Sequence, residues 1–357
     1  MDPELKQAIF QIDTDKAFRT VALKVFSFQA AHNPVYREYL DTLGADPAKI
    51  RDPEAIPFLP VEFFRTRRVI CDGYDPEMVF ESSGTTGSSP SRHFLADASL
   101  YRRSFTEGFR LFYGPPENYC ILALLPSYLE RGGSSLVTMM DHLIGKSGHP
   151  DSGFYLDRLD SLAGILRNRR QDRHPTLLLG VSFALLDLAE KFPMELADHI
   201  IVMETGGMKG RRKELVREEL HRILTAAFGL PVIHSEYGMT ELLSQAYAHG
   251  GGLFRAPPWM KILIRDPNDP LTILTPGERD FRPGSHPGST DDTAIDFPAG
   301  LKKNSASGSL NIIDLANLYS CSFIATGDLG TLHHDGRFEV TGRFDHADVR
   351  GCNLMVP

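Results

Sequence analysis

The stretch CILALL at residues 120–125 decides the fold class of this 357-residue chain. A continuous apolar run of this length is typical of a strand that is buried on both faces of a sheet. Similar elements alternate further along the chain, with apolar runs at residues 176–181 and 200–203 and helical patterns at 156–167, 183–192 and 209–228. The alternation predicts an α/β fold in which helices cover a layered sheet.

The first 75 residues differ from this core and predict an N-terminal helical segment that is packed on it. Asp15 can cap a helix in which apolar residues from 18 to 28 share one face, and Asn33-Pro34 ends that helix. A second amphipathic helix at residues 35–43 stops at Gly44. The segment IPFLPVEFF at residues 56–64 is too rich in proline for a helix, so we expect an extended segment.

The C-terminal part of the chain predicts two further regions after an α/β core at residues 76–278. Residues 279–307 are crowded with Pro, Gly, Ser, Thr and Asp and show no periodicity, so we expect a mobile insertion without secondary structure. Residues 308–357 predict a β-rich subdomain, in which HDGR at residues 334–337 forms a hairpin turn.

Composition and charge limit the function classes. The chain has 38 Lys and Arg against 46 Asp and Glu, and its formal net charge of −8 at pH 7 argues against a nucleic-acid partner. No run approaches the roughly 18 apolar residues of a membrane span, and the N-terminus has no secretory signal. The 4 cysteines form no CxxC pair, which favours a reducing compartment. We therefore expect a cytoplasmic protein, and an enzyme from its size.

The segment SSGTTGSSPSR at residues 82–92 is the first candidate site. Its glycines leave backbone N–H groups open, and its hydroxyls add donors, so the loop can wrap an anion such as a phosphate. Arg92 is placed to meet that anion. The alternative is a flexible linker, which this composition also fits. A Walker A loop is excluded because the segment contains no lysine.

The segment SEYGMTE at residues 235–241 is the second candidate. It follows an apolar run at residues 230–233, so a hydroxyl and a carboxylate come together on a turn after a predicted strand. Such a pair suits a phosphate oxygen and a Mg²⁺ ion. The alternative is the capped start of a helix, with Ser235 or Thr240 as the N-cap.

Three shorter segments are weak signals when each is taken alone. ETGGMKGRR at residues 204–212 is a glycine-rich turn after a strand, and GRFD at residues 342–345 follows the predicted hairpin. ATGDL at residues 325–329 places Asp328 where a strand meets a turn, so this carboxylate can accept both hydroxyls of a ribose or simply close the turn.

In their order and spacing, these five segments resemble the motifs of adenylate-forming ligases, the superfamily of acyl-CoA synthetases and luciferase-like enzymes. They cover residues 82–345, about three quarters of the chain. The chain is similar in particular to the short acyl-protein synthetase branch, the synthetase component of bacterial luminescence fatty-acid reductases. IPFLPVEFF, ATGDLG and the ending RGCNLMV look like that branch. Phenylacetate–CoA ligases are more distant relatives.

The resemblance implies a role for individual residues. Thr240 would contact the ATP α-phosphate and Glu241 would bind Mg²⁺, while Asp328 would hold the ribose hydroxyls and Arg343 would reach the ribose or a phosphate. The resemblance further implies a triphosphate loop and an adenine pocket, made respectively of Ser83, Gly84, Thr85, Thr86 and Gly87, and of Gly206, Gly207, Tyr237 and Gly238.

The resemblance also implies a reaction. A carboxylic acid, fatty or aryl, would be activated by ATP to an acyl-adenylate, and the acyl group would then pass to a thiol on a protein. Cys352 would accept it because the short branch uses a cysteine near its C-terminus, although Cys352 also fits a buried apolar strand position. A protein or reductase partner is implied. The alternatives are a CoA ligase of the phenylacetate type and a non-catalytic nucleotide- or acyl-binding module of a larger complex.

The chain departs from the long members of the superfamily at its end. Those members carry a further C-terminal domain of roughly a hundred residues, with a catalytic lysine, after the GRFD motif. Here only 14 residues follow Arg343. We therefore expect the adenylating large domain without the usual small C-terminal domain. In that case Arg92 or Arg350 substitutes for the lysine, the sequence is cut short, or activity depends on a partner.

Overall fold

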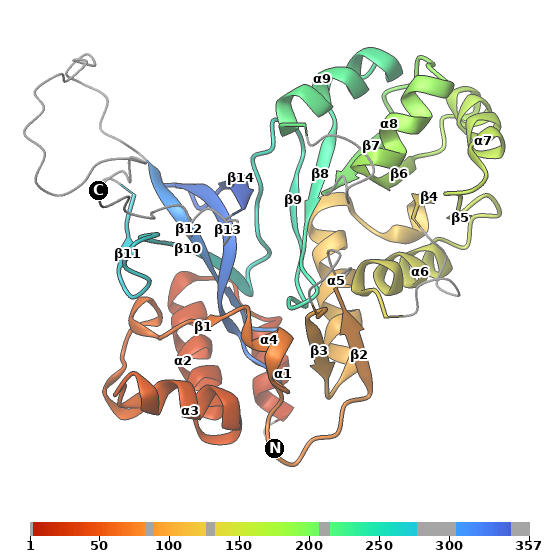
Figure 1. Cartoon of the computed structure of the whole chain (residues 1–357). Helices are drawn as coiled ribbons and strands as arrows, with labels where there is room; N and C mark the ends of the chain where they lie inside the picture. The colour runs from red at the N-terminus through yellow and green to blue at the C-terminus, as the bar shows by residue number, and fades with distance from the viewer. Residues whose placement is uncertain (1–2, 83–88, 126–132, 207–214, 277–304, 344–357) are drawn as a thin grey trace, which may run out of the picture.

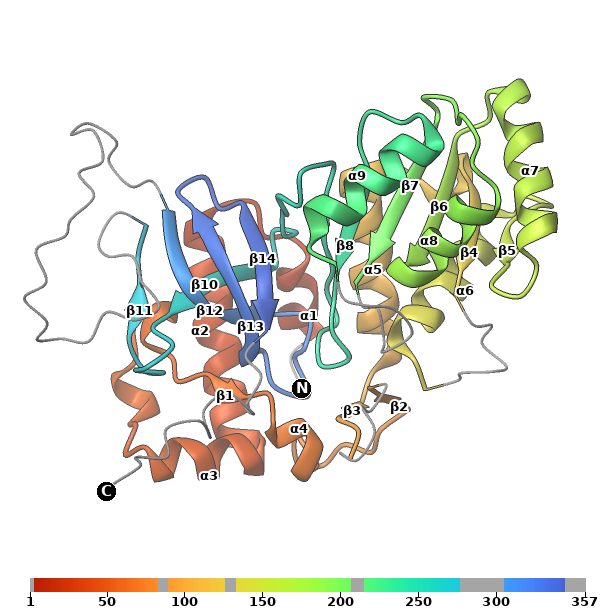
Figure 2. The same cartoon turned by 45° about the horizontal axis from the view of Figure 1, so that its top comes forward.

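The computed structural model describes residues 3–82, 89–125, 133–206, 215–276 and 305–343. Figures 1 and 2 show two bodies side by side: a sheet covered by helices α6–α9, and a second sheet beside the N-terminal helices. The larger part of the predicted insertion at 279–307 lies outside the described residues, but its last three residues do not. They begin the strand β12 (Ser305–Asp314), because their backbone already pairs with the neighbouring strand. The prediction of no secondary structure is therefore wrong for these three residues.

The predicted α/β core forms a six-stranded sheet in the order β5-β4-β6-β7-β8-β9. Its strands are β4 (Cys120–Leu124), β5 (Gly153–Phe154), β6 (Thr176–Val181), β7 (Ile200–Thr205), β8 (His234–Tyr237) and β9 (Ala246–Ala248). Neighbours from β5 to β8 are parallel, and β9 is antiparallel to β8. Every residue of β4 and β6 is buried, as the continuous apolar runs predict.

Helices follow these strands and confirm the predicted alternation. They are α6 (Ser135–Ser147), α7 (Leu159–Asp172), α8 (Ser182–Lys191) and α9 (Arg217–Phe228). The predicted bounds 156–167 for α7 were set too early, and the first residues predicted for the last helix, 209–214, lie outside the described residues. Gly180 allows β6 to pack closely on β4, since an added Cβ would lie 2.8 Å from Leu124 Cβ.

The second sheet joins strands from both ends of the chain in the order β1-β13-β12-β10-β11, with β14 on β13. Its further strands are β1 (Leu59–Pro60), β10 (Met260–Arg265), β11 (Ile273–Leu274), β13 (Phe323–His333) and β14 (Phe338–Arg343). The predicted hairpin turn at 334–337 is confirmed between β13 and β14. This sheet therefore contains strands from the predicted N-terminal segment, the predicted α/β core and the predicted C-terminal subdomain.

The N-terminal segment is helical, as the sequence predicts, but its helix α2 packs on this second sheet, whereas the sequence placed it on the α/β core. Its helices are α1 (Pro3–Ile9), α2 (Asp15–His32) and α3 (Pro34–Thr42). The prediction of Asp15 as the cap of α2 is wrong: Asp15 is the first helical residue, and Thr14 Oγ1 accepts a backbone N–H bond of 3.2 Å. Gln29 donates at 2.9 Å to two carbonyl groups before β13, and Phe26 meets Phe323 at 5.9 Å between ring centroids.

The segment at 56–64 is extended only in part. Leu59 and Pro60 form β1, which lies parallel to β13. The prediction fails after the last proline. The residues that follow can donate backbone N–H bonds, and they form the single helical turn α4 (Phe63–Thr66).

A separate hairpin lies between the two bodies. Its strands β2 (Met78–Glu81) and β3 (Arg92–Leu95) are antiparallel and lead into α5 (Ala98–Tyr113). Short 3₁₀ turns complete the described elements: η1 (Pro47–Lys49), η2 (Pro53–Ala55) and η3 (Pro116–Asn118). In the described part of the chain, none of the helices combines the length and the apolar character needed to pass through a bilayer.

Candidate functional site

Asp328 brings together three residues that the sequence places far apart. The Tyr237 hydroxyl donates a hydrogen bond of 2.8 Å to Asp328 Oδ2, and Arg343 Nε lies 3.6 Å from Oδ1. Asp328 and Arg343 face each other in the β13–β14 ladder. The prediction that ATGDL ends a strand at a turn is wrong, because the segment lies inside the long strand β13. Ala325 and Leu329 pair with β12, and a register shift lies between these two pairs.

Tyr237 is held at this place by aromatic packing. Its ring meets Phe254 at 5.9 Å and Phe338 at 5.7 Å between centroids. Burial raises its pKa well above the ordinary value, and the charge of Asp328 raises it further. The phenol is therefore a neutral donor throughout the physiological range, which fixes the orientation of the Asp328 carboxylate.

The SEYGMTE segment lies differently from its prediction. Its first residues continue the strand β8, which begins at His234 and not at residue 230, so Glu236 and Tyr237 are strand residues. Residues 238–245 then form a non-helical connection to β9. The alternative of a capped helix start is therefore wrong, since no helix follows Thr240.

Buried polar groups hold the backbone of that connection. His93 Nδ1 lies 2.9 Å from the Thr240 carbonyl oxygen, and His93 Nε2 lies 2.9 Å from Asn317 Oδ1. Asn317 Nδ2 in turn donates at 2.7 Å to the Glu241 carbonyl. Burial lowers the pKa of His93 to about 4, so its imidazole is neutral at pH 7. Thr240 and Glu241 are thus positioned from two other elements.

Asp314, at the end of β12, fixes the next residues of the same connection. Asp314 Oδ2 accepts from the Leu243 and Ser244 N–H groups at 2.7 and 2.9 Å. Its other oxygen accepts from Ser244 Oγ at 2.5 Å. Asp314, Asn317 and His93 are side chains that sequence reasoning missed, because no motif surrounds them and their role depends on the distant segment they contact.

Glu241 lies beside the base of the predicted phosphate loop. Its side chain is buried, and burial raises its pKa, while a hydrogen bond with Ser91 and the charge of Arg343 oppose that rise. Ser82 and Ser91 close the loop by two hydrogen bonds, from Ser91 N to Ser82 Oγ at 2.9 Å and from Ser82 N to the Ser91 carbonyl at 3.0 Å. The ends of this loop therefore meet the YGMTE connection.

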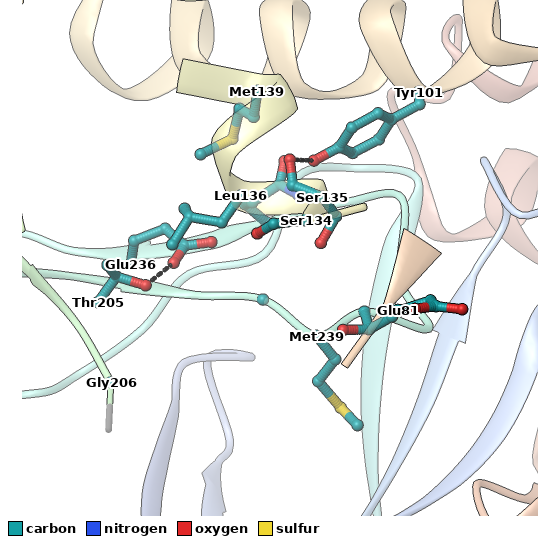
Figure 3. Close-up of a pocket in the computed structure, with 13 residues that line it drawn as sticks. Glu81, Tyr101, Ser134, Ser135, Leu136, Met139, Thr205, Gly206, Glu236 and Met239 are labelled. Carbon is teal, nitrogen blue, oxygen red and sulfur yellow. Dashed lines mark hydrogen bonds between the residues drawn. The ribbon is translucent and has the colours of Figure 1, made fainter. Parts of the chain in front are cut away.

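A cavity of about 180 Å³ lies next to Thr240, between the ends of β7 and β8 and the start of α6. Figure 3 shows Thr205 and Glu236 on one wall and Ser134, Ser135 and Leu136 on another. Its described lining is Glu81, Tyr101, Ser134, Ser135, Leu136, Met139, Thr205, Gly206, Glu236, Gly238, Met239, Thr240 and Gln245. Three predicted site residues, Gly206, Gly238 and Thr240, are among them.

Glu236 is the buried carboxyl group of this cavity and was missed by the motif analysis. Its Oε2 accepts from Thr205 Oγ1 at 2.5 Å (Figure 3). Burial raises its pKa to about 7 against that hydrogen bond, and the nearby Glu204 adds to the rise. A correct placement of β8 at residues 234–237 would have revealed it, because residues on both faces of a strand within a covered sheet are buried.

The groups around Glu236 define its electrostatic surroundings. Glu204 on β7 stays ionised: burial opposes this, but a hydrogen bond from His221 and the charge of Arg217 hold its pKa below the ordinary value. The phenols that face Glu236 have pKa values raised by burial and remain neutral, and they are Tyr101 and Tyr113 on α5 and Tyr247 on β9.

Gly238 gives the Glu236 carboxylate its space. A Cβ added at Gly238 would lie 2.6 Å from Glu236 Oε1, which is closer than any real contact. An added Cβ at Gly206, in contrast, would meet nothing within 4 Å. Only one of these two predicted glycines is thus required by side-chain packing.

Several predicted residues lie outside the described residues or away from the site. The first group is Ser83, Gly84, Thr85, Thr86, Gly87, Gly207, Arg350 and Cys352. Arg92 is described and exposed, and faces Glu81 in the hairpin. His234 lies 3.1 Å from the Tyr113 hydroxyl and is not among the described lining residues. The other cysteines, Cys71, Cys120 and Cys321, are free and buried.

The predicted magnesium ligand Glu241 is a buried carboxyl group beside the base of the 82–92 loop. Within the described ranges, no group of three His, Cys, Asp or Glu side chains could hold a metal ion. Mg²⁺ is commonly bound by one or two carboxylates together with phosphate oxygens of a nucleotide. A single buried carboxylate beside the predicted phosphate loop fits this mode of Mg²⁺ binding.

Solved structures share this architecture, while no family model and no curated protein matches the chain. A crystal structure of 2-hydroxyisobutyryl-CoA ligase in the postadenylation state with 2-HIB-AMP has a TM-score of 0.61 at 13% identity, covering 93% of this chain and 68% of that one. An open conformation of that ligase with 2-HIB-AMP and CoA gives 0.60 at 13% identity, covering 93% and 70%.

ATP-bound MatB from Rhodopseudomonas palustris gives a TM-score of 0.49 at 18% identity, covering 74% of this chain and 47% of that one. The chain thus spans about half the length of MatB and about two thirds of the length of the ligase. The fold expected from the motif resemblance is confirmed by the 2-hydroxyisobutyryl-CoA ligase structures. The chain has the α/β fold of the large domain of adenylate-forming enzymes, as that ligase has it.

Proposed function

We propose that this protein is an enzyme that activates a carboxylic acid with ATP, forming an acyl-adenylate and releasing pyrophosphate. The observation that carries the proposal is the convergence of the Tyr237–Asp328–Arg343 cluster, Glu241 with the base of the 82–92 loop, and a cavity that begins at Thr240. These parts come from four separate stretches of sequence. A nucleotide site and an acid site are both needed for adenylation, and both have candidates here.

Each side chain has a task in this reaction. Asp328 accepts the ribose hydroxyls, because its carboxylate is already oriented by Tyr237 and lies on a rigid strand. Arg343 has 65% of its side chain exposed and can turn from Asp328 toward a phosphate. Thr240 donates to the α-phosphate, where negative charge builds up as the carboxylate attacks.

Glu241 would hold a Mg²⁺ ion against the nucleotide phosphates. The ion, when bound, offsets the repulsion between the acid and the triphosphate. The protein's part is to keep the Glu241 carboxylate aimed at the phosphates through Ser91 and through the Asn317 bond to its backbone. Binding of a cation favours the ionised carboxylate, which burial alone disfavours.

The acyl acceptor is the second part of the proposal. A thiolate attacks the acyl carbonyl, a thioester forms and AMP leaves. We propose a protein thiol as the acceptor, with Cys352 as the candidate. CoA is the alternative, and the fold shared with a CoA ligase favours testing it directly. A non-catalytic nucleotide-binding module is the remaining alternative.

Acid-dependent exchange of labelled pyrophosphate into ATP tests the first step. We expect exchange that requires both the acid and Mg²⁺, and that falls in Thr240→Val. ATP binding without exchange across a broad panel of acids, with partner protein present, would instead favour the binding module. Labelled acyl retained on wild type and lost in Cys352→Ala would identify the protein acceptor, whereas CoA-dependent thioester release without protein labelling would identify the ligase.

A further inference from the structure

We propose that the cavity beside Thr240 binds a small carboxylic acid that carries an amino group, and that Glu236 and Gln245 receive its ammonium. This inference rests on the proposed function, in which the acid's carboxylate attacks the α-phosphate that Thr240 contacts. It names the substrate class, which the sequence leaves as fatty or aryl acids.

Glu236 supplies the first contact. The residue is only 6% exposed, yet it lines the cavity at the end of β8. Its one described hydrogen bond comes from the Thr205 hydroxyl to Oε2. In the part of the chain that the structure describes, no ion pair joins this carboxyl group to a base, and an ionised carboxylate that is buried without a cation is costly. A ligand cation would remove that cost.

Gln245 supplies the second contact, independently of Glu236. It is also 6% exposed and lines the same cavity, and its buried Oε1 has no hydrogen-bond partner in the described part of the chain. Buried polar atoms in native proteins are almost always paired, so we assign this acceptor, on a residue that lines the cavity, to a donor from the ligand. An ammonium has three N–H donors and can serve both acceptors.

Charge and size select among possible donors. Among the described lining residues there is no Lys, Arg or His, so the wall holds acceptors, hydroxyls and apolar side chains around one buried carboxyl group. The volume of about 180 Å³ lies below the roughly 300–1,000 Å³ of drug-sized ligand pockets. A cavity of about 150 Å³ holds benzene, so an acid on the order of six to ten non-hydrogen atoms fits.

The test compares pairs of acids that differ only in an ammonium and a methyl group. Pyrophosphate exchange is measured at pH 8 for 3-aminopropanoate and butanoate, 4-aminobutanoate and pentanoate, and 5-aminopentanoate and hexanoate, with octanoate as the long-chain acid. We expect one amino member to exceed its partner by about 100-fold or more in kcat/KM, because the methyl analogue leaves buried acceptors unpaired.

Variants link the preference to Glu236. Glu236→Gln keeps the shape and removes the charge, and should reduce the preference of the best pair to below about tenfold. The control Glu195→Gln alters a carboxylate that is 78% exposed and lies before the start of β7, whereas the cavity lies at the end of that strand, and it should leave the preference unchanged. The wild-type comparison stands even where the variant fails to fold.

Failure of the ammonium site and failure of the adenylation proposal give different results. Exchange in which the alkanoates, octanoate included, equal or exceed the amino acids overturns the ammonium site and leaves the adenylation proposal standing. Absence of exchange with every acid, while ATP still raises the melting temperature, overturns the adenylation proposal and this inference with it.

Discussion

The Tyr237 hydroxyl donates a 2.8 Å hydrogen bond to Asp328 Oδ2 across 91 residues of sequence. This bond joins β8 of the α/β sheet to the long strand β13 of the second sheet. Arg343 approaches the other carboxylate oxygen, so the Asp328 carboxylate has a partner on each oxygen before any ligand binds. This prior orientation reduces the side-chain entropy that Asp328 loses on binding.

Asp328→Asn should weaken nucleotide use. An amide cannot accept two hydroxyls as a carboxylate does, and hydrogen bonds to a charged group contribute about 1.5–3 kcal/mol, so we expect the KM for ATP to rise roughly 10- to 100-fold. The measurement is the ATP dependence of pyrophosphate exchange. Asp335→Asn, in the hairpin turn of the same two strands, is the matched control. An unchanged KM in Asp328→Asn would argue against ribose binding here.

Asp314→Ala should destabilise the protein as a whole. The change leaves the buried Leu243 and Ser244 N–H groups unpaired, and each unpaired group costs about 1–3 kcal/mol. We expect the free energy of unfolding in urea to fall by about 2–4 kcal/mol. A loss below about 0.5 kcal/mol would show that water replaces the carboxylate and that the connection is not held by Asp314.

Gly238→Ala should reduce exchange by displacing Glu236. The added methyl group would lie 2.6 Å from Glu236 Oε1, so the carboxylate must move within a buried site. We expect kcat/KM for the acid to fall about tenfold or more, while ATP binding measured by calorimetry changes less. Gly145→Ala in α6, where an added Cβ meets nothing within 4 Å, is the control. Equal losses in both variants would contradict this explanation.

The pH dependence of stability should report the buried Glu236 carboxyl group. Its pKa is about 7 in the folded protein against an ordinary 4.5, so the folded state binds the proton more tightly. The stability from this group is therefore present below about pH 4.5 and is lost as pH rises through about 7. Relative to Glu236→Gln, the wild type should lose on the order of 2–3 kcal/mol between these limits.

Urea unfolding of both proteins at several pH values gives this difference directly. Of the groups that face Glu236, the tyrosines stay neutral in this window, and Glu204 is ionised in both proteins. A constant difference between wild type and variant from pH 4.5 to 7.5 would show that Glu236 titrates normally. Addition of the ammonium-bearing acid should reduce the loss, because the ligand favours the ionised carboxylate.

The sequence by itself determined the elements whose patterns are local. The strand at 120–125, the alternation after it and the hairpin turn at 334–337 follow from short-range periodicity and turn chemistry, and the structure confirms them. The five motifs in order indicated an adenylate-forming fold. Local signals misplaced the cap of α2 and the start of β8. The ends of helices and strands are uncertain by one or two residues, and tertiary packing there outweighs local propensity.

Only the tertiary structure decided how these pieces form a site. The second sheet draws β1, β10 and β13 from distant regions, and that pairing is what carries Asp328 to Tyr237. The roles of Asp314 and of Glu236 depend on neighbours that no sequence window contains. A hydrogen bond or a buried charge is defined by its partner and its surroundings, and the chain brings these together only on folding.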